Sequence, residues 1–164
     1  MKLHKNDKEK AENIMQAFQM ANDSLTESRS LDEMIDAYDK VVKFCSSSAE
    51  CKKDRSVKRN TLLFWAYQNI AKAYEQKKLP SAAYMYLEKA VLTSTSDKQR
   101  ANVLEKMIEL IGKEDITVKE RCEKILKTTE LLANIYEKLG EQKDWERVLN
   151  LAARTAEILQ KTGN

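Results

Sequence analysis

Residue types that carry acid–base or nucleophilic chemistry are scarce in this chain. Its 164 residues include a single histidine, His4, which lies close to the N-terminus. A Ser–His or Cys–His catalytic pair and a histidine-based metal site are therefore not expected. The chain has three glycines, and no glycine-rich motif for phosphates or dinucleotides occurs among them. We expect no catalytic residues, no metal site and no cofactor, and we expect that the chain is not an enzyme.

Three cysteines remain as reactive groups: Cys45, Cys51 and Cys122. Cys45 and Cys51 flank the connector 46–50, and a disulfide between them is sterically possible. An odd number of cysteines and the absence of a secretion signal favour reduced thiols instead. Cys122 falls on an apolar stripe and is expected in the core. No two cysteines have the spacing of a structural zinc site.

Charged residues of both signs are mixed along the chain, with 29 basic and 26 acidic residues and a net charge of +3. Carboxylates such as Glu137 and Glu141 alternate with lysines, which is typical of a solvated helix surface. One basic cluster, residues 52–59, stands out. It would suit nucleic acid, a nucleotide phosphate or an acidic peptide, but it lacks interleaved aromatic residues. We favour a solvated helix start here and keep nucleic-acid binding as an alternative.

The composition predicts an all-α protein. One proline, three glycines and 42% apolar residues leave little material for hairpin turns. No run approaches the roughly 20 apolar residues of a membrane span, and the opening segment does not resemble a secretory leader. We expect a cytoplasmic protein with a flexible N-terminus, residues 1–6, and one helical domain, residues 7–161.

Apolar periodicity and capping signals predict seven helices, with boundaries uncertain by roughly two to four residues. Their expected ranges are 7–27, 31–46, 57–77, 80–94, 97–112, 118–139 and 145–161. Ser or Thr followed three residues later by Glu or Gln marks three helix starts, at Ser30, Ser96 and Thr117. Simple caps are expected at Ser56 and Asp144, and Pro80 suits a first helical turn. Left-handed glycines are expected at three helix ends, Gly112, Gly140 and Gly163.

The pair of helices 57–77 and 80–94 carries the most informative pattern. Small and large apolar residues recur there at the spacing of two antiparallel helices packed as one unit: Tyr67, Ile70, Ala71, Tyr74, Ala83, Leu87, Ala90 and Thr95. This pattern resembles the tetratricopeptide repeat. The chain departs from that family's pattern at Tyr67, Ala71, Leu87 and Thr95, which stand for Trp, Gly, an aromatic residue and Pro.

Other parts of the chain repeat the pattern less clearly. Leu132, Ala133 and Tyr136 follow the spacing of Ile70, Ala71 and Tyr74. The intervening unit is the weakest, so helix 118–139 either ends a genuine third repeat or runs unbroken through a repeat boundary. The resemblance implies a solenoid of antiparallel helix hairpins, because one repeat has too little core to be stable alone.

The resemblance also implies a function, binding a peptide or helix of another protein in a concave groove. Carried onto this chain, the groove positions are Trp65, Gln68, Lys72, Glu75, Asn102, Lys106, Glu130, Asn134 and Glu137. Trp65 has two alternatives, projection toward the groove or packing against the preceding helix. Glu130 and Asn134 stand where chaperone-tail binders of the family have basic residues, so chaperone tails are not expected as ligands. We expect a non-catalytic adaptor or chaperone-like module without membrane or nucleic-acid partners, with homodimerisation as a further alternative.

Overall fold

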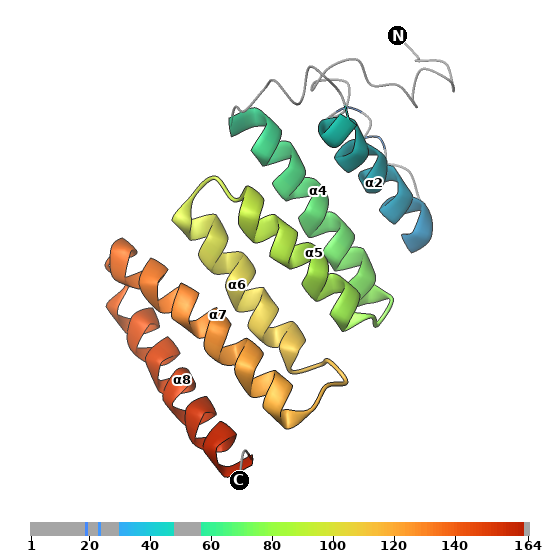
Figure 1. Ribbon diagram of the computed structural model, residues 1–164. Coiled ribbons are helices and arrows are strands. Elements are labelled where there is room, and N and C mark those ends of the chain that lie inside the picture. Colours follow the sequence, from blue (N-terminus) through green and yellow to red (C-terminus); the bar gives the residue numbers. More distant parts are fainter. Residues whose placement is uncertain (1–18, 20–22, 24–29, 48–56, 163–164) are drawn as a thin grey trace. The chain divides into compact units, whose positions relative to one another are not determined.

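The computed structural model describes residues 19, 23, 30–47 and 57–162. Within these residues the chain is all-α, as predicted, and six helices are present (Figure 1). They are α2 Leu31–Ser47, α4 Val57–Gln76, α5 Pro80–Thr93, α6 Asp97–Ile111, α7 Val118–Leu139 and α8 Gln142–Thr162. The predicted segment 1–6, Cys51, the cap Ser56 and Gly163 lie outside the described residues, and so does the predicted helix 7–27 except for residues 19 and 23, which are helical.

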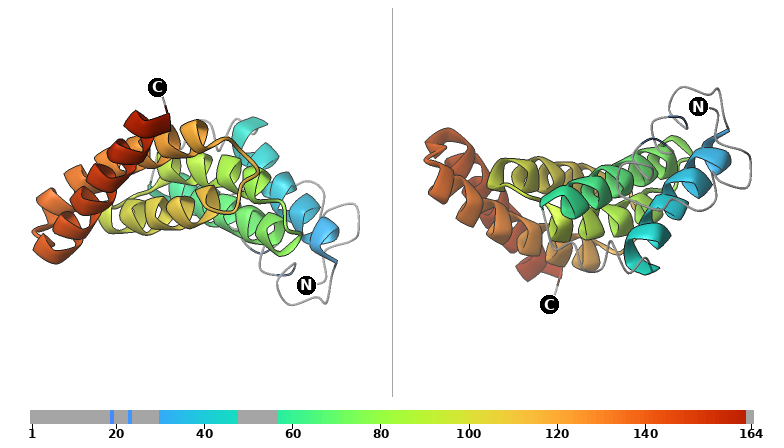
Figure 2. Two further views of the ribbon diagram at one scale, coloured as in Figure 1. Left: turned by 90° about the horizontal axis from the view of Figure 1, so that it is seen from below. Right: turned by 90° about the horizontal axis from the view of Figure 1, so that it is seen from above.

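The chain divides into two compact units, residues 1–95 and 96–164. In the described part of the first unit, α4 packs against both α2 and α5. Within this unit, α2 and α4, and α4 and α5, run side by side and antiparallel (Figures 1 and 2). The central place of α4 follows from its sequence, because apolar side chains occupy most of its circumference and such a helix must be covered by its neighbours.

The core of the first unit contains Tyr38 of α2 together with Leu62, Ala66 and Ile70 of α4, all 0% exposed. Ala71 and Ala83 are also buried, at 3% and 0% exposure. Alanine at both positions allows α4 and α5 to approach closely. This agrees with the close helix contact that the sequence predicts there.

In the described part of the second unit, α7 is the central helix and packs against α6 and α8. The buried side chains at its core include Leu104, Ile111, Leu132 and Val148. α7 runs without a break from Val118 to Leu139, which decides between the two alternatives left open by the sequence. The helix therefore continues through the position where a repeat boundary would fall.

The three capping signals all form hydrogen bonds. The side chains of Ser30 and Ser96 accept the backbone N–H of the third following residue, each at 3.2 Å. Thr117 forms the complete reciprocal box with Glu120, with both hydrogen bonds at 3.1 Å. Because these bonds involve neighbours in sequence, they fix the helix starts where the pattern places them.

Two predicted helix ends need correction. Gly140 is left-handed, with φ +70°, but Gly112 is right-handed, with φ −64°. The N–H of Gly112 still donates to the carbonyl of Ile108 at 3.4 Å, so the chain keeps helical geometry there. α8 begins at Gln142, three residues before the predicted start, because the N–H of Trp145 already donates to Glu141 at 2.9 Å. Asp144 consequently lies within the first turn and is not the cap.

None of the helices in the described residues combines the length and apolar character needed to cross a membrane.

Candidate functional site

No cluster of three His, Cys, Asp or Glu side chains with metal-binding geometry occurs in the described residues. Cys45 and Cys122 are both buried, at 0% and 4% exposure, and Cys122 occupies the core position that the sequence predicts. Buried thiols in apolar surroundings are poor nucleophiles.

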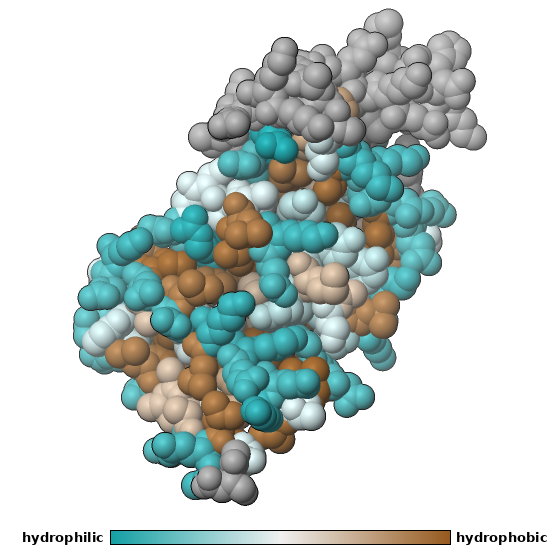
Figure 3. All heavy atoms as spheres, in the orientation of Figure 1, coloured by the Kyte–Doolittle hydropathy of each residue, from teal (hydrophilic) through white to brown (hydrophobic). Residues whose placement is uncertain are grey.

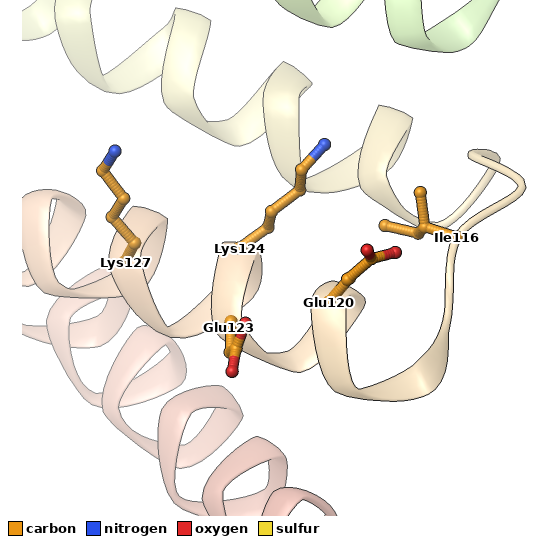
Figure 4. Close-up of a pocket in the computed structure, with 5 residues that line it drawn as sticks. All are labelled: Ile116, Glu120, Glu123, Lys124 and Lys127. Carbon is orange, nitrogen blue, oxygen red and sulfur yellow. The ribbon is translucent and has the colours of Figure 1, made fainter.

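A pocket of about 350 Å³ lies beside the first half of α7 and is lined by Ile116, Glu120, Glu123, Lys124 and Lys127 (Figure 4). Lys124 and Lys127 extend toward α6, whereas Glu123 points away from them. The charged groups have structural roles. Glu120 completes the cap of α7, and Lys124 Nζ lies 2.8 Å from Glu114, whose side chain is 1% exposed. Glu120 and Lys124 thus stabilise the turn between α6 and α7.

The basic cluster at 52–59 is described only in its last part. The Arg59 side chain is partly buried, and its Nη2 donates to the carbonyl oxygen of Cys45 at 3.2 Å. That carbonyl belongs to the last turn of α2, where the helix has unpaired acceptors and partial negative charge. Arg59 therefore joins the start of α4 to the end of α2 and is not an exposed phosphate ligand.

The predicted groove residues divide between the two units. Trp65, Gln68, Lys72 and Glu75 lie on α4, and the other five lie on α6 and α7. Lys72 is exposed and Gln68 and Glu75 are half-buried, whereas Asn102, Glu130, Asn134 and Glu137 are exposed. Lys106 forms an ion pair with Glu109 at 3.2 Å. A single groove that joins both units stays a prediction.

Trp65 packs against the preceding helix, the second of its two alternatives. Its ring meets the Tyr38 ring of α2 edge to face, with centroids 5.2 Å apart and an interplanar angle of 82°. Its contact with the core therefore stabilises the α2–α4 pair. The structure gives Trp65 a packing role within the first unit.

A different aromatic cluster stands out on the first unit. Tyr74 of α4 and Tyr86 of α5 stack with centroids 5.5 Å apart and an interplanar angle of 14°. Tyr67 of α4 lies 6.3 Å from the Tyr86 ring at 40°. All three rings are half-buried. We call these three tyrosines, together with Lys89 of α5, the tyrosine surface.

Lys89 places a cation over this surface. Its Nζ lies 4.9 Å from the centroid of the Tyr86 ring and 5.9 Å from that of Tyr67. Both distances are within the range of a cation–π contact. The lysine side chain is exposed, so the ammonium group reaches the rings from the solvent side.

Asp39 of α2 provides a negative charge beside the same rings. Burial is the largest cause of the raised pKa of Tyr86, and Tyr74 and Asp39 add to it. Burial is again the largest cause for the raised pKa of Tyr67, to which Asp39 also contributes. Asp39 forms an ion pair with Lys43 at 2.9 Å. The rings thus lie in a field to which both α2 and α5 contribute.

Exposed apolar side chains continue the surface along α5. Met85 is 58% exposed and Leu92 is 85% exposed. Met85 and Leu92 are seven residues apart, which is almost two helical turns, so their side chains leave α5 on the same face. Tyr86 and Lys89 are on the adjoining face. Apolar areas separated by hydrophilic side chains are the general pattern on the described residues in Figure 3. Leu92 is the most exposed of the large apolar side chains described.

Sequence reasoning missed this surface because Tyr67 and Tyr74 match core positions of the repeat pattern. They do contact the core of the first unit, but the rings remain partly accessible. The sequence feature that could have indicated this surface is on α5. Three large side chains, Met85, Tyr86 and Leu92, lie there outside the buried stripe of Ala83 and Leu87.

Comparison of the chain with protein-family models gives no match, and comparison with curated proteins gives none either.

Proposed function

We propose that the chain is a non-catalytic protein-interaction module whose binding surface on the first unit is the tyrosine surface. The helices form antiparallel hairpins that we propose to be of the tetratricopeptide type. The module presents these rings and the exposed apolar side chains of α5 to a segment of another protein. The polar face of α4 at Gln68, Lys72 and Glu75, which the repeat pattern favours, is the alternative binding surface.

One observation carries the proposal: tyrosine rings and large apolar side chains are exposed together on a rigid pair of helices. Met85 and Leu92 are 58% and 85% exposed, and the half-buried ring of Tyr86 belongs to the same helix. Aromatic residues and methionine are enriched at protein interfaces. Aromatic side chains bury a large area and lose little conformational entropy. A contact surface of this kind supports binding of another protein.

The proposal is tested by affinity capture from the native cell extract, followed by titration of the purified partner. In the first variant, Met85→Ser is combined with Leu92→Ser. Both side chains are exposed, so we expect the stability to change by no more than about 0.5 kcal/mol for each substitution. We expect the affinity for the partner to fall at least tenfold, measured by calorimetry.

A matched variant on α4 replaces Gln68, Lys72 and Glu75 with serine. We expect this variant to retain the partner with unchanged affinity. If it loses the partner while the α5 variant binds normally, the polar face of α4 is the binding surface and the tyrosine surface is not. If neither the wild-type chain nor any variant retains a protein, the proposed function is wrong.

A further inference from the structure

The tyrosine surface already accommodates a cation of its own chain. The Lys89 ammonium group lies over two of its rings. Aromatic faces attract cations because the negative lobes of the π system point outward. The carboxylate of Asp39 adds negative charge near Tyr67 and Tyr86, although it is paired with Lys43, and Lys43 and Arg59 act on the rings in the opposite direction. The chemistry of the surface is therefore that of a cation acceptor.

Lys89 is only weakly held in this place. Its side chain is exposed, and an exposed cation–π contact contributes about 0.5–1 kcal/mol. No ion pair of Lys89 is among those formed in the described residues, in contrast to Lys43, which is bound to Asp39, and Lys77, which is bound to Asp32. The side chain can therefore leave the rings at little cost.

We propose that an arginine side chain of the partner protein displaces Lys89 and binds across the Tyr67 and Tyr86 rings beside Asp39. The guanidinium group suits this site better than an ammonium group, because it is planar, stacks on aromatic faces and is more weakly hydrated. This inference rests on the proposed function, since it specifies the chemistry of the partner segment that binds the tyrosine surface.

The test uses the full chain and methylguanidinium as the probe, with methylurea as a neutral probe of similar shape. Aromatic ¹H–¹³C NMR spectra follow the tyrosine rings during titration. We expect saturable shifts of Tyr67 and Tyr86 with methylguanidinium and none with methylurea. Tyr136 lies in the second unit, is bound to Glu105, and serves as the internal reference that does not shift.

Two matched variants separate this site from nonspecific charge effects. Lys89→Met removes the competing cation, and we expect methylguanidinium to bind about two- to fivefold more tightly, the equivalent of one exposed cation–π contact. Lys72→Met makes the same change on the polar face of α4, and we expect it to leave binding unchanged.

Equal shifts with methylguanidinium and methylurea would overturn the inference, and so would the absence of any shift of these rings in both the wild-type chain and Lys89→Met. Either result leaves the capture experiment unaffected, because partner binding through Met85 and Leu92 does not require an arginine. If the Met85 and Leu92 variant loses the partner and the tyrosine rings do not shift, the proposed arginine contact is wrong. The proposed interaction surface then still holds.

Discussion

At the scale of single residues, the Glu105 carboxylate of α6 contacts side chains of two other helices. The Glu105 carboxylate accepts a hydrogen bond from the Tyr136 hydroxyl of α7 at 2.8 Å. It also forms an ion pair with Arg147 of α8. Arg147 also contacts Asp144 at 3.3 Å. Three helices of the second unit are thus joined through one carboxylate. Burial, followed by the hydrogen bond to Glu105, raises the pKa of the Tyr136 phenol well above its usual value.

The raised pKa of Tyr136 predicts a loss of stability at alkaline pH. A tyrosine in the unfolded chain titrates near pH 10, and the folded chain keeps the phenolic proton to higher pH. Below about pH 10 both states are protonated and the contribution is complete. Above it the unfolded state loses protons first, so the free energy of unfolding falls as the pH rises.

Tyr136→Phe measures this contribution. We expect the variant to be less stable by about 1–2 kcal/mol near neutral pH, because the hydrogen bond to a charged carboxylate is lost. The difference from the wild-type chain should shrink between about pH 10 and 11. Urea unfolding at a series of pH values provides the comparison. A difference that stays constant across this range would show that Tyr136 titrates alike in both states.

At the scale of elements, the helix ends were the most predictable feature. Five of the six described helices begin at the predicted residue. Three of these starts have a side-chain cap within the same turn, and α5 begins with Pro80 instead. The exception is α8, whose start was placed at an Asp144 cap. The local sequence does not show whether Asp144 caps the helix or lies within its first turn. The helix begins earlier because Gly140 completes the turn before it.

The two glycines at helix ends should respond differently to alanine. Gly140→Ala places a side chain at φ +70°, and we expect a loss of about 1 kcal/mol. Gly112→Ala lies at φ −64°, and its new Cβ would meet only the Glu109 carbonyl at 3.4 Å. We expect this variant to be as stable as the wild-type chain or slightly more stable. Equal destabilisation of both in thermal melts would contradict the assigned backbone conformations.

The contact between α4 and α5 depends on small residues. We expect Ala71→Leu and Ala83→Leu each to cost about 1–3 kcal/mol, because both positions are buried where the helices meet and extra methylene groups overpack the interface. Ser81→Leu is the control, since Ser81 is exposed on the same helix. Chemical unfolding measures these free-energy changes. Unchanged unfolding midpoints for both Ala71→Leu and Ala83→Leu would show that the helices are not in close contact at these positions.

The candidate surface was less predictable than the helices that carry it. Periodicity identified Ile70 and Ala71 as buried, which is correct. It also placed Tyr67 and Tyr74 in the core, although a wide side chain at the edge of a stripe can be half covered. The exposure of the Tyr67 and Tyr74 rings depends on the position of the Tyr86 ring of α5. The contact between these rings arises from the packing of α4 against α5, which neither helix's sequence pattern shows.

At the scale of the whole molecule, the two units repeat one principle. Each has a central helix, α4 or α7, packed between two others. The charges are nearly balanced, with a net charge of +3. The proposed recognition therefore rests on local features of the surface. The most distinctive of these in the described residues are the tyrosine surface and the exposed side chains of α5.

The account is tested most directly by site-specific photo-cross-linking in cells. A benzophenone amino acid replaces Met85 in one variant and Lys72 in another; both side chains are exposed, and they lie on different helices. We predict a discrete covalent adduct with one protein from position 85 and none from position 72. The adduct should disappear when Leu92→Ser is added. Adducts from position 72 alone, or none from position 85 while the captured partner is present, would contradict the central claim that this surface binds another protein.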